Sequence, residues 1–299
     1  MDVPATHSIA LETAPTLEQL RSAADWLAHQ PHPTPELELL LNLLLQGRLV
    51  AQETGDYVAI ADRGSDPDRS TPNQIQGVVV ARSGNHNVSL ASRDRPTTDA
   101  LLKAIQPRGC FHRIATSHQV KDWLLPMLQP QYQLQRDHHP LVMICTQPPL
   151  GGAGRWAVPQ DKPALQAYAE AYQSERGSGN VHPHWDDLIQ DQQVAVLEQS
   201  GHIVAVVKWG ATLHHALVLG LFTFPQFRRQ GFAHRLLAFL VAERLKDYPA
   251  VKLWVDEDNT AAITLYQRLG FQAIGSCYTA YFAPSCPNNS KGDRACDRP

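Results

Sequence analysis

The chain has 299 residues, and because a domain commonly has roughly 100–200 residues, this length predicts two domains, each with its own core. Hydrophobic residues make up 43% of the chain and charged residues 18%, which excludes an intrinsically disordered protein. The formal net charge is −3, so the chain has no basic field for a nucleic acid or an anionic membrane, and we expect neither partner.

The sequence predicts neither export nor a membrane span. Residues 1–7 contain neither a basic segment nor an apolar one, unlike a secretory signal. The longest apolar run, residues 216–224, is interrupted by Gly220 and is far shorter than the roughly 18 residues of a transmembrane helix. The cysteines are odd in number and lack CxxC spacing, which favours a reducing cytoplasm. They are Cys110, Cys145, Cys277, Cys286 and Cys296.

Hydrophobic periodicity in the first half predicts helices and strands in alternation. We expect helices at 17–29 and 35–45, strands at 57–61, 77–82 and 88–92, a helix at 97–105, a strand at 111–115, a helix at 120–128 and a strand at 141–145. Residues 64–73 are rich in turn formers and predict a long hairpin loop.

The second half repeats this order. We expect helices at 163–175 and 183–191, strands at 194–198, 203–209 and 216–224, a helix at about 231–245, a strand at 251–255, a helix at 260–269 and a strand at 271–282. The elements predict an α/β fold with a mixed sheet, and the shared order predicts an internal duplication.

Proline and glycine cluster at 147–154, which is typical of a linker. We therefore predict an N-terminal domain at 1–147, a linker at 148–155 and a second domain at 156–282. Residues 283–299 contain little that could pack and predict a disordered tail.

A strand-to-helix turn at residues 228–233 is a candidate anion site. The first amides of a helix lack intrahelical partners and lie at the positive end of the helix dipole, so they suit a phosphate. Gly231 lets the backbone approach such a ligand closely, and Arg228 and Arg229 bring positive charge. Taken alone, these residues also fit an ordinary solvated turn.

A second candidate lies at residues 259–271. Asn259 is suited to cap the helix that follows, and Tyr266 lies two turns further along the same face. Gly270 fits the end of this helix. Each residue also has an ordinary structural interpretation.

Together, the apolar strand ending at Pro225, the R-x-x-G-x-A turn and the N-x-x-A-x-x-L-Y-x-x-x-G-F run resemble the GNAT superfamily of acyl-CoA-dependent N-acyltransferases, and specifically the subgroup related to glycine N-acyltransferases. The resemblance covers about residues 156–282. It implies an N-acetyltransferase that takes acetyl-CoA as the acyl donor and a primary amine as the acceptor, without a metal.

The resemblance also implies roles for individual residues. Tyr266 would protonate the departing thiolate, because a phenol with an ordinary pKa of about 10 is protonated at neutral pH. Asn259 would contact the pantetheine arm. The remaining positions implied for binding the donor are Leu221, Phe222 and Thr223 beside pantetheine, and Arg228, Arg229, Gln230, Gly231, Phe232, Ala233 and His234 around the pyrophosphate.

The first half lacks these features. Residues 92–99, where its third strand meets a helix, contain no glycine, and no N-x-x-A-x-x-L-Y run occurs near 120–128. The half therefore resembles the degenerate N-terminal domain of double-GNAT proteins and is not expected to hold CoA. An unrelated α/β domain of the same order is the alternative.

The general base is less obvious. Related enzymes that acetylate protein N-termini often carry a glutamate on the strand before the asparagine, and that position here is Trp254. An α-amine, with a pKa of about 7.7–8.0, needs less assistance than a lysine at about 10.4, so we expect an α-amine or a small weakly basic amine as acceptor. The alternative is assistance through water from another group; the candidates are Asp256, Glu198, His214 and His215.

The 14 histidines are scattered without metal-ligand spacing, so we expect no metal. Residues His182, His184, Trp185 and Asp186 lie where GNAT proteins line the acceptor cleft, although a surface loop is the simpler interpretation. The main alternative function is a non-catalytic CoA-binding sensor or interaction module. The sequence favours no particular oligomeric state.

Overall fold

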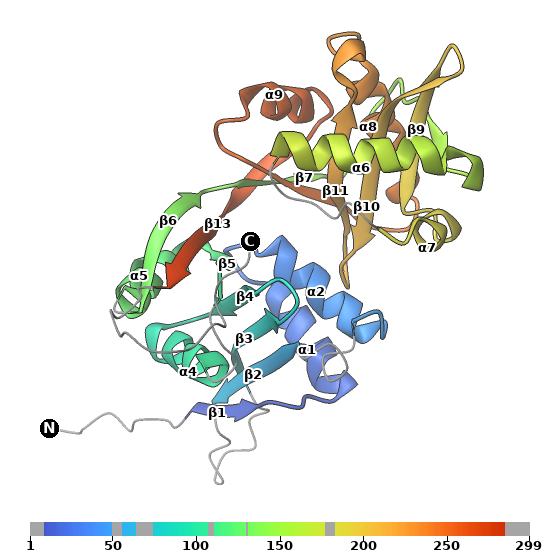
Figure 1. The fold of residues 1–299 in the computed structure, drawn as a ribbon. Helices are drawn as coiled ribbons and strands as arrows, with labels where there is room; N and C mark the ends of the chain where they lie inside the picture. The colour runs from blue at the N-terminus through green and yellow to red at the C-terminus, as the bar shows by residue number, and fades with distance from the viewer. Residues whose placement is uncertain are drawn as a thin grey trace, which may run out of the picture. The chain divides into compact units, whose positions relative to one another are not determined.

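The computed structural model describes residues 9–49, 56–63, 74–106, 111–129, 131–176 and 183–284. The chain forms two compact units, each with a mixed sheet and helices (Figure 1). The first unit comprises residues 1–14, 51–138 and 278–299, and the second comprises 15–50 and 139–277. Within the described ranges, every helix is too short or too polar to cross a bilayer.

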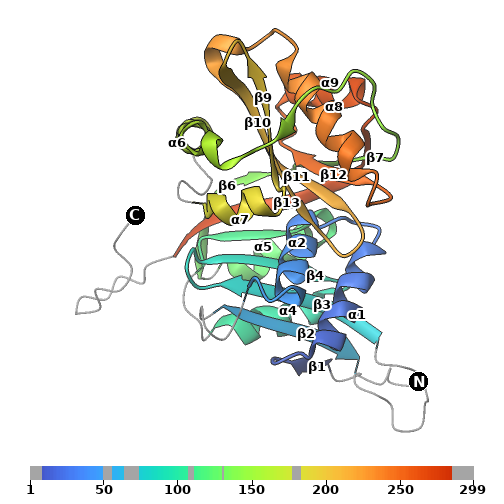
Figure 2. The same cartoon turned by 90° about the vertical axis from the view of Figure 1, so that its right-hand side faces the viewer.

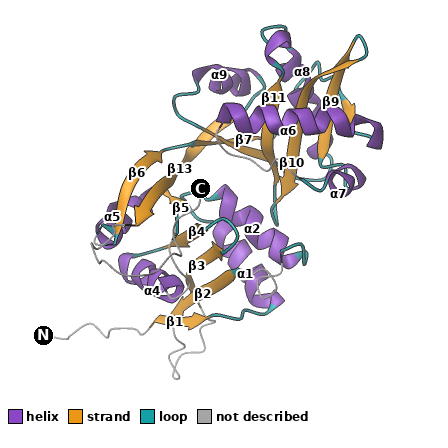
Figure 3. Ribbon diagram, in the orientation of Figure 1, coloured by secondary structure: helices purple, strands orange, loops and turns teal. Residues whose placement is uncertain are grey.

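The first unit is built on a sheet of strand order β1-β2-β3-β4-β5-β13-β6 (Figure 3). Its elements are β1 Ile9–Glu12, β2 Tyr57–Arg63, β3 Gln74–Arg82, β4 Asn87–Ser92, α4 Arg95–Ile105, β5 Arg113–Ser117, the short 3-10 helix η2 His118–Val120, α5 Lys121–Leu128, β6 Tyr132–His138 and the end of β13 Gln272–Pro284. The first four strands are antiparallel and β5 is parallel to β4. The apolar residues of α4 and α5 pack on one face of this sheet.

The second unit contains a sheet of order β8-β9-β10-β11-β12-β7-β13. Its elements are α1 Leu17–Ala28, α2 Pro35–Leu45, β7 Leu141–Cys145, β8 Arg155–Trp156, η3 Pro159–Asp161, α6 Lys162–Arg176, α7 Trp185–Gln190, β9 Val194–Gln199, β10 His202–Ala211, β11 Ala216–Thr223, η4 Pro225–Phe227, α8 Phe232–Arg244, β12 Val251–Val255, α9 Thr260–Arg268 and the start of β13. Only β11 and β12 pair in parallel among these described strands.

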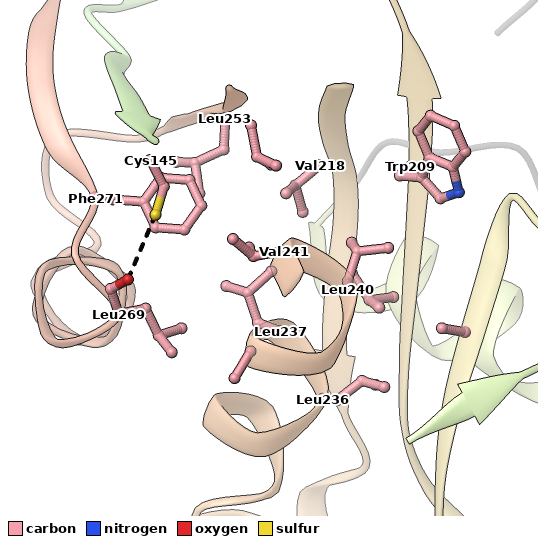
Figure 4. Packing of buried hydrophobic residues seen from close by; sticks show 14 of the residues in the cluster. Cys145, Trp209, Val218, Leu236, Leu237, Leu240, Val241, Leu253, Leu269 and Phe271 are labelled. Atoms are coloured by element: carbon pink, nitrogen blue, oxygen red, sulfur yellow. Dashed lines mark hydrogen bonds between the residues drawn. The ribbon is translucent and has the colours of Figure 1, made fainter. Parts of the chain in front are cut away.

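Helices cover both faces of the second sheet (Figure 2). The helix α8 presents an apolar stripe that is fully buried against one face, as the spacing of its leucines predicts. Figure 4 shows this core, in which the buried Cys145 thiol donates a hydrogen bond to the Leu269 carbonyl at 3.6 Å. The labelled stripe residues are Leu236, Leu237, Leu240 and Val241. The opposite face packs against α6 and α7.

Helix α2 also packs in the second unit. Its Glu38 forms an ion pair with Lys252 of β12, and its Asn42 side chain donates a hydrogen bond to the Ala211 carbonyl of β10 at 2.8 Å. The residues Lys252 and Trp254 alternate with core residues of β12 that face α8, so α2 lies on the sheet face that also carries α6.

Each sheet receives a strand from a distant part of the chain. In the second unit β7 lies between β12 and residues 272–276 of β13. In the first unit, residues 279–284 of β13 pair with β6, so β13 contributes to both sheets. Only His139 and Pro140 separate β6 from β7, and a proline cannot donate to the ladder, so the chain leaves the first sheet there.

The compact units therefore differ from the contiguous segments 1–147 and 156–282 expected from the sequence, since α1, α2 and β7 pack in the second unit. The sequence does not predict the strands β1, β6 and β8. Residues 283 and 284 belong to β13 rather than to a tail. The rest of the predicted tail and the predicted loop at 64–73 lie outside the described residues.

Candidate active site

The parallel strands β11 and β12 separate after a short paired segment. Their register contains only Ala216 opposite Val251 and Leu217 opposite Lys252, although both strands are described along their whole length and continue to Thr223 and Val255. The edge of β11 that faces β12 therefore has backbone groups without a strand partner. An extended ligand with amide groups could pair with this edge as an added strand would.

A β-bulge interrupts β11 beside this opening. Lys208 of β10 lies opposite Gly220, and the next residue, Trp209, lies opposite Val218, so Leu219 has no partner. A bulge bends its strand and reorients the neighbouring groups. The bulge therefore contributes to the separation of β11 from β12.

The turn after β11 leads directly into α8. Gly231 is the N-cap of this helix with a φ of +79°, and no side chain caps the helix. A Cβ at Gly231 would have no heavy atom within 4 Å, so the backbone is accessible there. The first amides of α8 have no intrahelical partners, and they lie at the positive end of the dipole. The turn therefore presents free backbone amides, and the binding of an anion there stays a prediction.

The two arginines of the turn differ. The Arg228 guanidinium donates to the Thr223 carbonyl at 3.0 Å and to the Glu175 carboxylate at 2.5 Å, so its charge is already paired. Arg229 is exposed, has a φ of +61°, and forms no ion pair within the described ranges. Of the two, Arg229 is the better placed to meet a phosphate.

The other predicted donor-binding residues fall into two groups. Gln230 is exposed, and Ala233 and His234 are half-buried in the first turn of α8. Phe232 and Phe222 are buried in the two cores and Leu221 packs against the α8 core, so their side chains are structural. Backbone contacts with a ligand at these positions stay a prediction.

Thr223, the last residue of β11, has a polar side chain that lacks a hydrogen-bond partner in the described part of the chain. Its hydroxyl oxygen is buried and has no hydrogen-bond partner among the residues that the structure describes. A buried hydroxyl without a partner costs free energy, typically about 1–3 kcal/mol. A ligand in the opening between β11 and β12 would explain why a threonine stands there.

Asn259 caps α9, as its position predicts. Its side-chain oxygen accepts a hydrogen bond from the amide of Ala262 at 3.2 Å. The role in binding pantetheine would therefore fall to the side-chain amide nitrogen, and it stays a prediction.

Tyr266 lies on α9 against the core, with its ring 5.9 Å from that of Phe271. Burial is the main cause that raises the pKa of Tyr266 to about 12; the neighbouring Tyr172 raises it further and Arg176 opposes this. The phenol therefore keeps its proton throughout the physiological pH range.

The last turn of α6 bridges the ends of the two separated strands. Glu175 pairs with Arg228, which follows β11, and Arg176 pairs with Asp256, which follows β12, at 3.5 Å. These ion pairs are exposed and contribute little stability, but they place α6 across the opening. No motif in the sequence singles out Tyr172 and Arg176. Their signal is the spacing of Tyr168, Tyr172 and Arg176 along one face of the predicted helix.

Of the four groups considered for base assistance, only Asp256 lies at the open end of β12. Glu198 pairs with Arg155 at the far side of the sheet. His214 and His215 precede β11, at the end opposite Thr223. Trp254 is half-buried on β12 and supplies no base.

The predicted acceptor residues around α7 are largely structural. The Trp185 indole is buried and donates to Gln166 at 3.3 Å, and Asp186 pairs with Lys162 at 2.5 Å. His184 precedes the helix as its N-cap, and His182 lies outside the described residues. In the part of the chain that the structure describes, no cluster of three metal-ligand residues occurs.

Comparison with known proteins identifies the segment that carries this site. The profile of the acetyltransferase (GNAT) family matches residues 162–271. An acetyltransferase of Yersinia enterocolitica is 35% identical over 78 residues, which are 26% of this chain and 55% of that protein. Residues 162–271 form a GNAT-family domain. This GNAT domain runs from α6 to the residue before β13 and contains the turn, Asn259 and Tyr266.

Solved structures extend the likeness of fold beyond the GNAT domain. A GCN5-related N-acetyltransferase from Sphaerobacter thermophilus aligns over 92% of this chain and 95% of its own, with a TM-score of 0.59 and 19% identity. A tandem GNAT protein from the clavulanic acid biosynthesis pathway aligns over 94% of this chain and all of its own, with a TM-score of 0.57 and 13% identity. At sequence identities of 19% and 13%, these structures show that the chain has a similar fold. The chain spans 23% to 60% of the lengths of the curated relatives that it matches.

Proposed function

We propose that the protein is an N-acetyltransferase that transfers the acetyl group of acetyl-CoA to a primary amine. The observation that carries this proposal is the combination, in one GNAT domain, of the separated strands β11 and β12, the open anion turn at Gly231 and the protonated Tyr266. The three features match the extended arm, the pyrophosphate and the leaving thiolate of an acyl-CoA.

Different residues of the chain would bind different parts of acetyl-CoA. The amides that begin α8, with Arg229, bind the pyrophosphate. The free edge of β11 and the Thr223 hydroxyl receive the pantetheine amides, and the Asn259 side chain adds a contact from α9. This arrangement holds the thioester beside the bulge at Leu219, where the acceptor amine can reach it.

The chemistry is a direct displacement. The neutral amine attacks the thioester carbonyl carbon, a carbon–nitrogen bond forms, and the carbon–sulfur bond breaks. Tyr266 donates its phenolic proton to the departing sulfur. Because a phenol with a pKa of about 12 is a strong base once ionised, Tyr266 then recovers a proton, through solvent, from the acceptor nitrogen. Asp256 assists by accepting a hydrogen bond from the water that carries this proton.

The absence of a carboxylate at Trp254 favours an acceptor that is already partly neutral. An α-amine or another weakly basic amine meets this condition near pH 7.5, whereas a lysine side chain does not. The first unit would then be a degenerate GNAT-like domain that does not bind CoA. Its sheet repeats the strand pattern of the second, with a parallel fifth strand and an inserted strand before the last, which supports a duplicated origin.

The test is release of free thiol from acetyl-CoA with a panel of α-amines and small amines, comparing the parent protein with Tyr266→Phe. We expect kcat to fall by roughly 10²–10⁴-fold while the affinity for acetyl-CoA stays within about threefold. Tyr248→Phe is the control, because Tyr248 packs on Trp209 on the α8 side of the sheet. Binding of CoA without turnover of any acceptor would favour the sensor function instead.

A further inference from the structure

The face of the second sheet that carries α6 contains a lysine in an apolar environment. Lys208 lies on β10, directly opposite Gly220 in the bulged part of β11. Its Nζ lies 5.7 Å from the centre of the Tyr168 ring. No carboxylate forms a salt bridge with Lys208 within the described ranges, and burial lowers the pKa of its ammonium group. Lys208 is half-buried, and a cation that is largely shielded from water without a counter-charge is costly.

The Tyr168 side chain also carries a polar group without a hydrogen-bond partner in the described part of the chain. It is 1% exposed, and its hydroxyl has no hydrogen-bond partner among the described residues. The hydroxyl points to Gly220, where it lies 2.9 Å from the position that a Cβ would occupy. The ring of Tyr172 also lies over this glycine. Within the described ranges, a hydroxyl without a hydrogen-bond partner and an ammonium group without a counter-charge therefore lie around the same tyrosine, next to the bulge.

This point lies between the two helices that cover the face. Gly220 is covered by Tyr168 of α6, and Gly210, two residues after Lys208 on the same side of β10, is covered by Leu39 of α2. The polar groups thus lie on the strip of sheet that separates α6 from α2. The open end of β11, with the groups assigned to the acyl donor, continues from this strip.

We propose that Lys208 and the Tyr168 hydroxyl bind an anionic group carried by the acceptor, so that the enzyme prefers amines bearing a carboxylate, sulfonate or phosphate. The inference rests on the proposed function, since it concerns the second substrate of the same site. A single anionic oxygen between them would give the ammonium group its counter-charge and the hydroxyl its acceptor, as charge-assisted hydrogen bonds. Neither group is explained by packing alone, because methionine and phenylalanine would fill the same space.

The test uses amidated dipeptides, whose α-amines belong to the weakly basic class proposed above: Asp-Ala-NH2, Glu-Ala-NH2 and phosphoserine-alanine amide carry a side-chain anion, and Asn-Ala-NH2, Gln-Ala-NH2 and Ser-Ala-NH2 are the matched neutral members. We expect the parent protein to have a kcat/KM at least tenfold higher for one or more anionic members than for the matched neutral one. Comparison among the anionic arms identifies which anion the site takes.

Lys208→Met should remove this preference while thiol release with the neutral amine stays within about threefold. Tyr168→Phe should weaken the preference several-fold. Lys246→Met is the matched control, because Lys246 is an exposed lysine at the end of α8, and it should retain the parental preference. Neither Lys208→Met nor Tyr168→Phe should lower the melting temperature, since Lys208 has no counter-charge and the Tyr168 hydroxyl has no hydrogen-bond partner among the described residues.

Calorimetric binding of the same amines to the CoA-bound protein decides the question independently of turnover. We expect the anionic member of a pair to bind at least tenfold more tightly than the neutral one, and the difference to disappear in Lys208→Met. Equal binding of both members, or a preference that survives in Lys208→Met, would overturn the proposal. Failure of thiol release with every amine would count against the proposed acetyltransferase activity, whereas the binding comparison would still decide the role of Lys208.

Discussion

Glu38 of α2 and Lys252 of β12 form a buried ion pair with a distance of 3.2 Å between Oε2 and Nζ, and their side chains are only 3% and 5% exposed. The pair joins residues 214 positions apart and fixes α2 to the second sheet. We predict that Glu38→Gln lowers the free energy of unfolding by about 3–5 kcal/mol, because it leaves a buried ammonium group unpaired. Urea denaturation measures this change.

The double variant Glu38→Leu with Lys252→Met should recover most of that loss, since apolar residues of similar size replace the whole pair. Glu243→Gln is the control: it breaks a pair whose lysine, Lys246, is exposed to solvent, and we expect a change below about 1 kcal/mol. Equal effects of Glu38→Gln and Glu243→Gln would show that the buried pair has no special role in attaching α2.

Alanine substitutions at two glycines, Gly231 and Gly201, distinguish a loss of stability caused by backbone strain from a loss of CoA binding. Gly231 and Gly201 have nearly the same φ, +79° and +78°, and a Cβ would meet no heavy atom within 4 Å at either. Alanine should therefore cost a similar 1–2 kcal/mol of stability, roughly, at each position. Only Gly231→Ala should weaken CoA binding, by at least tenfold in calorimetry, because Gly201 lies in the turn between β9 and β10. A parallel loss of affinity in both variants would contradict the assignment of the anion site.

The contact between Tyr168 and Gly220 predicts an energetic coupling. Gly220→Ala would place a Cβ 2.9 Å from the Tyr168 hydroxyl, and we expect a loss of about 1–3 kcal/mol from overpacking. Removing the hydroxyl relieves the contact, so the double variant with Tyr168→Phe should be less destabilised than the sum of the single variants. Gly84→Ala is the control, since a Cβ there has open space and an ordinary φ. Additive single effects in the double-variant cycle would argue against this contact.

Local signals account for what the sequence predicts correctly. The apolar stripe of α8, the glycine before it and the capping Asn259 each act within a few residues, and the structure confirms the elements that they define. The leucine-rich pattern of α2 likewise predicts a helix, but an apolar helix face carries no information on which sheet it covers. The assignment of α2 to the second unit follows from contacts with distant residues, among them the ion pair of Glu38 with Lys252 and the hydrogen bond of Asn42 to Ala211.

The parts of the site that the sequence does not predict depend on contacts between distant residues. The bulge at Leu219 results from a one-residue mismatch between β10 and β11, and an apolar run does not reveal it. The approach of Tyr168 to Gly220 requires α6 to cross β11 at that point. The division of β13 between two sheets likewise follows from which strand edges are free, and a continuous strand pattern at 271–282 does not specify its partners.

His215 predicts a loss of stability in mild acid. Burial, with smaller contributions from Lys252, His214 and His29, lowers its pKa to about 4, from an ordinary value of 6.5. Lys252 is paired with Glu38, and His214 with Asp25. Between pH 6.5 and 4 the unfolded state therefore binds more protons at this residue than the folded state, so the free energy of unfolding decreases as the pH falls through this window.

The size of this effect is reduced because the ring is partly exposed, and we expect about 1–2 kcal/mol. Urea denaturation at pH 7 and pH 4.5 measures it, with His215→Gln expected to lose this part of the pH dependence. His202→Gln, at the exposed start of β10, is the control and should behave as the parent does. A His215→Gln protein with the parental pH dependence would show that another group is responsible.

Tyr266 predicts the shape of the pH profile of acetyl transfer. Because its pKa is raised to about 12, the phenol carries its proton at every pH below about 11, and loss of the acid cannot limit the rate there. The value of kcat/KM should therefore rise with pH through the pKa of the acceptor, about 7.7–8.0 for an α-amine, and then stay level to pH 10. Initial rates from pH 6 to 10, with circular dichroism to verify folding, test this expectation. Tyr266→Phe should keep the rising limb at a much lower rate. A falling limb below pH 10 in the parent that disappears in Tyr266→Phe would show instead that Tyr266 ionises in the working enzyme, as a phenol without this burial would.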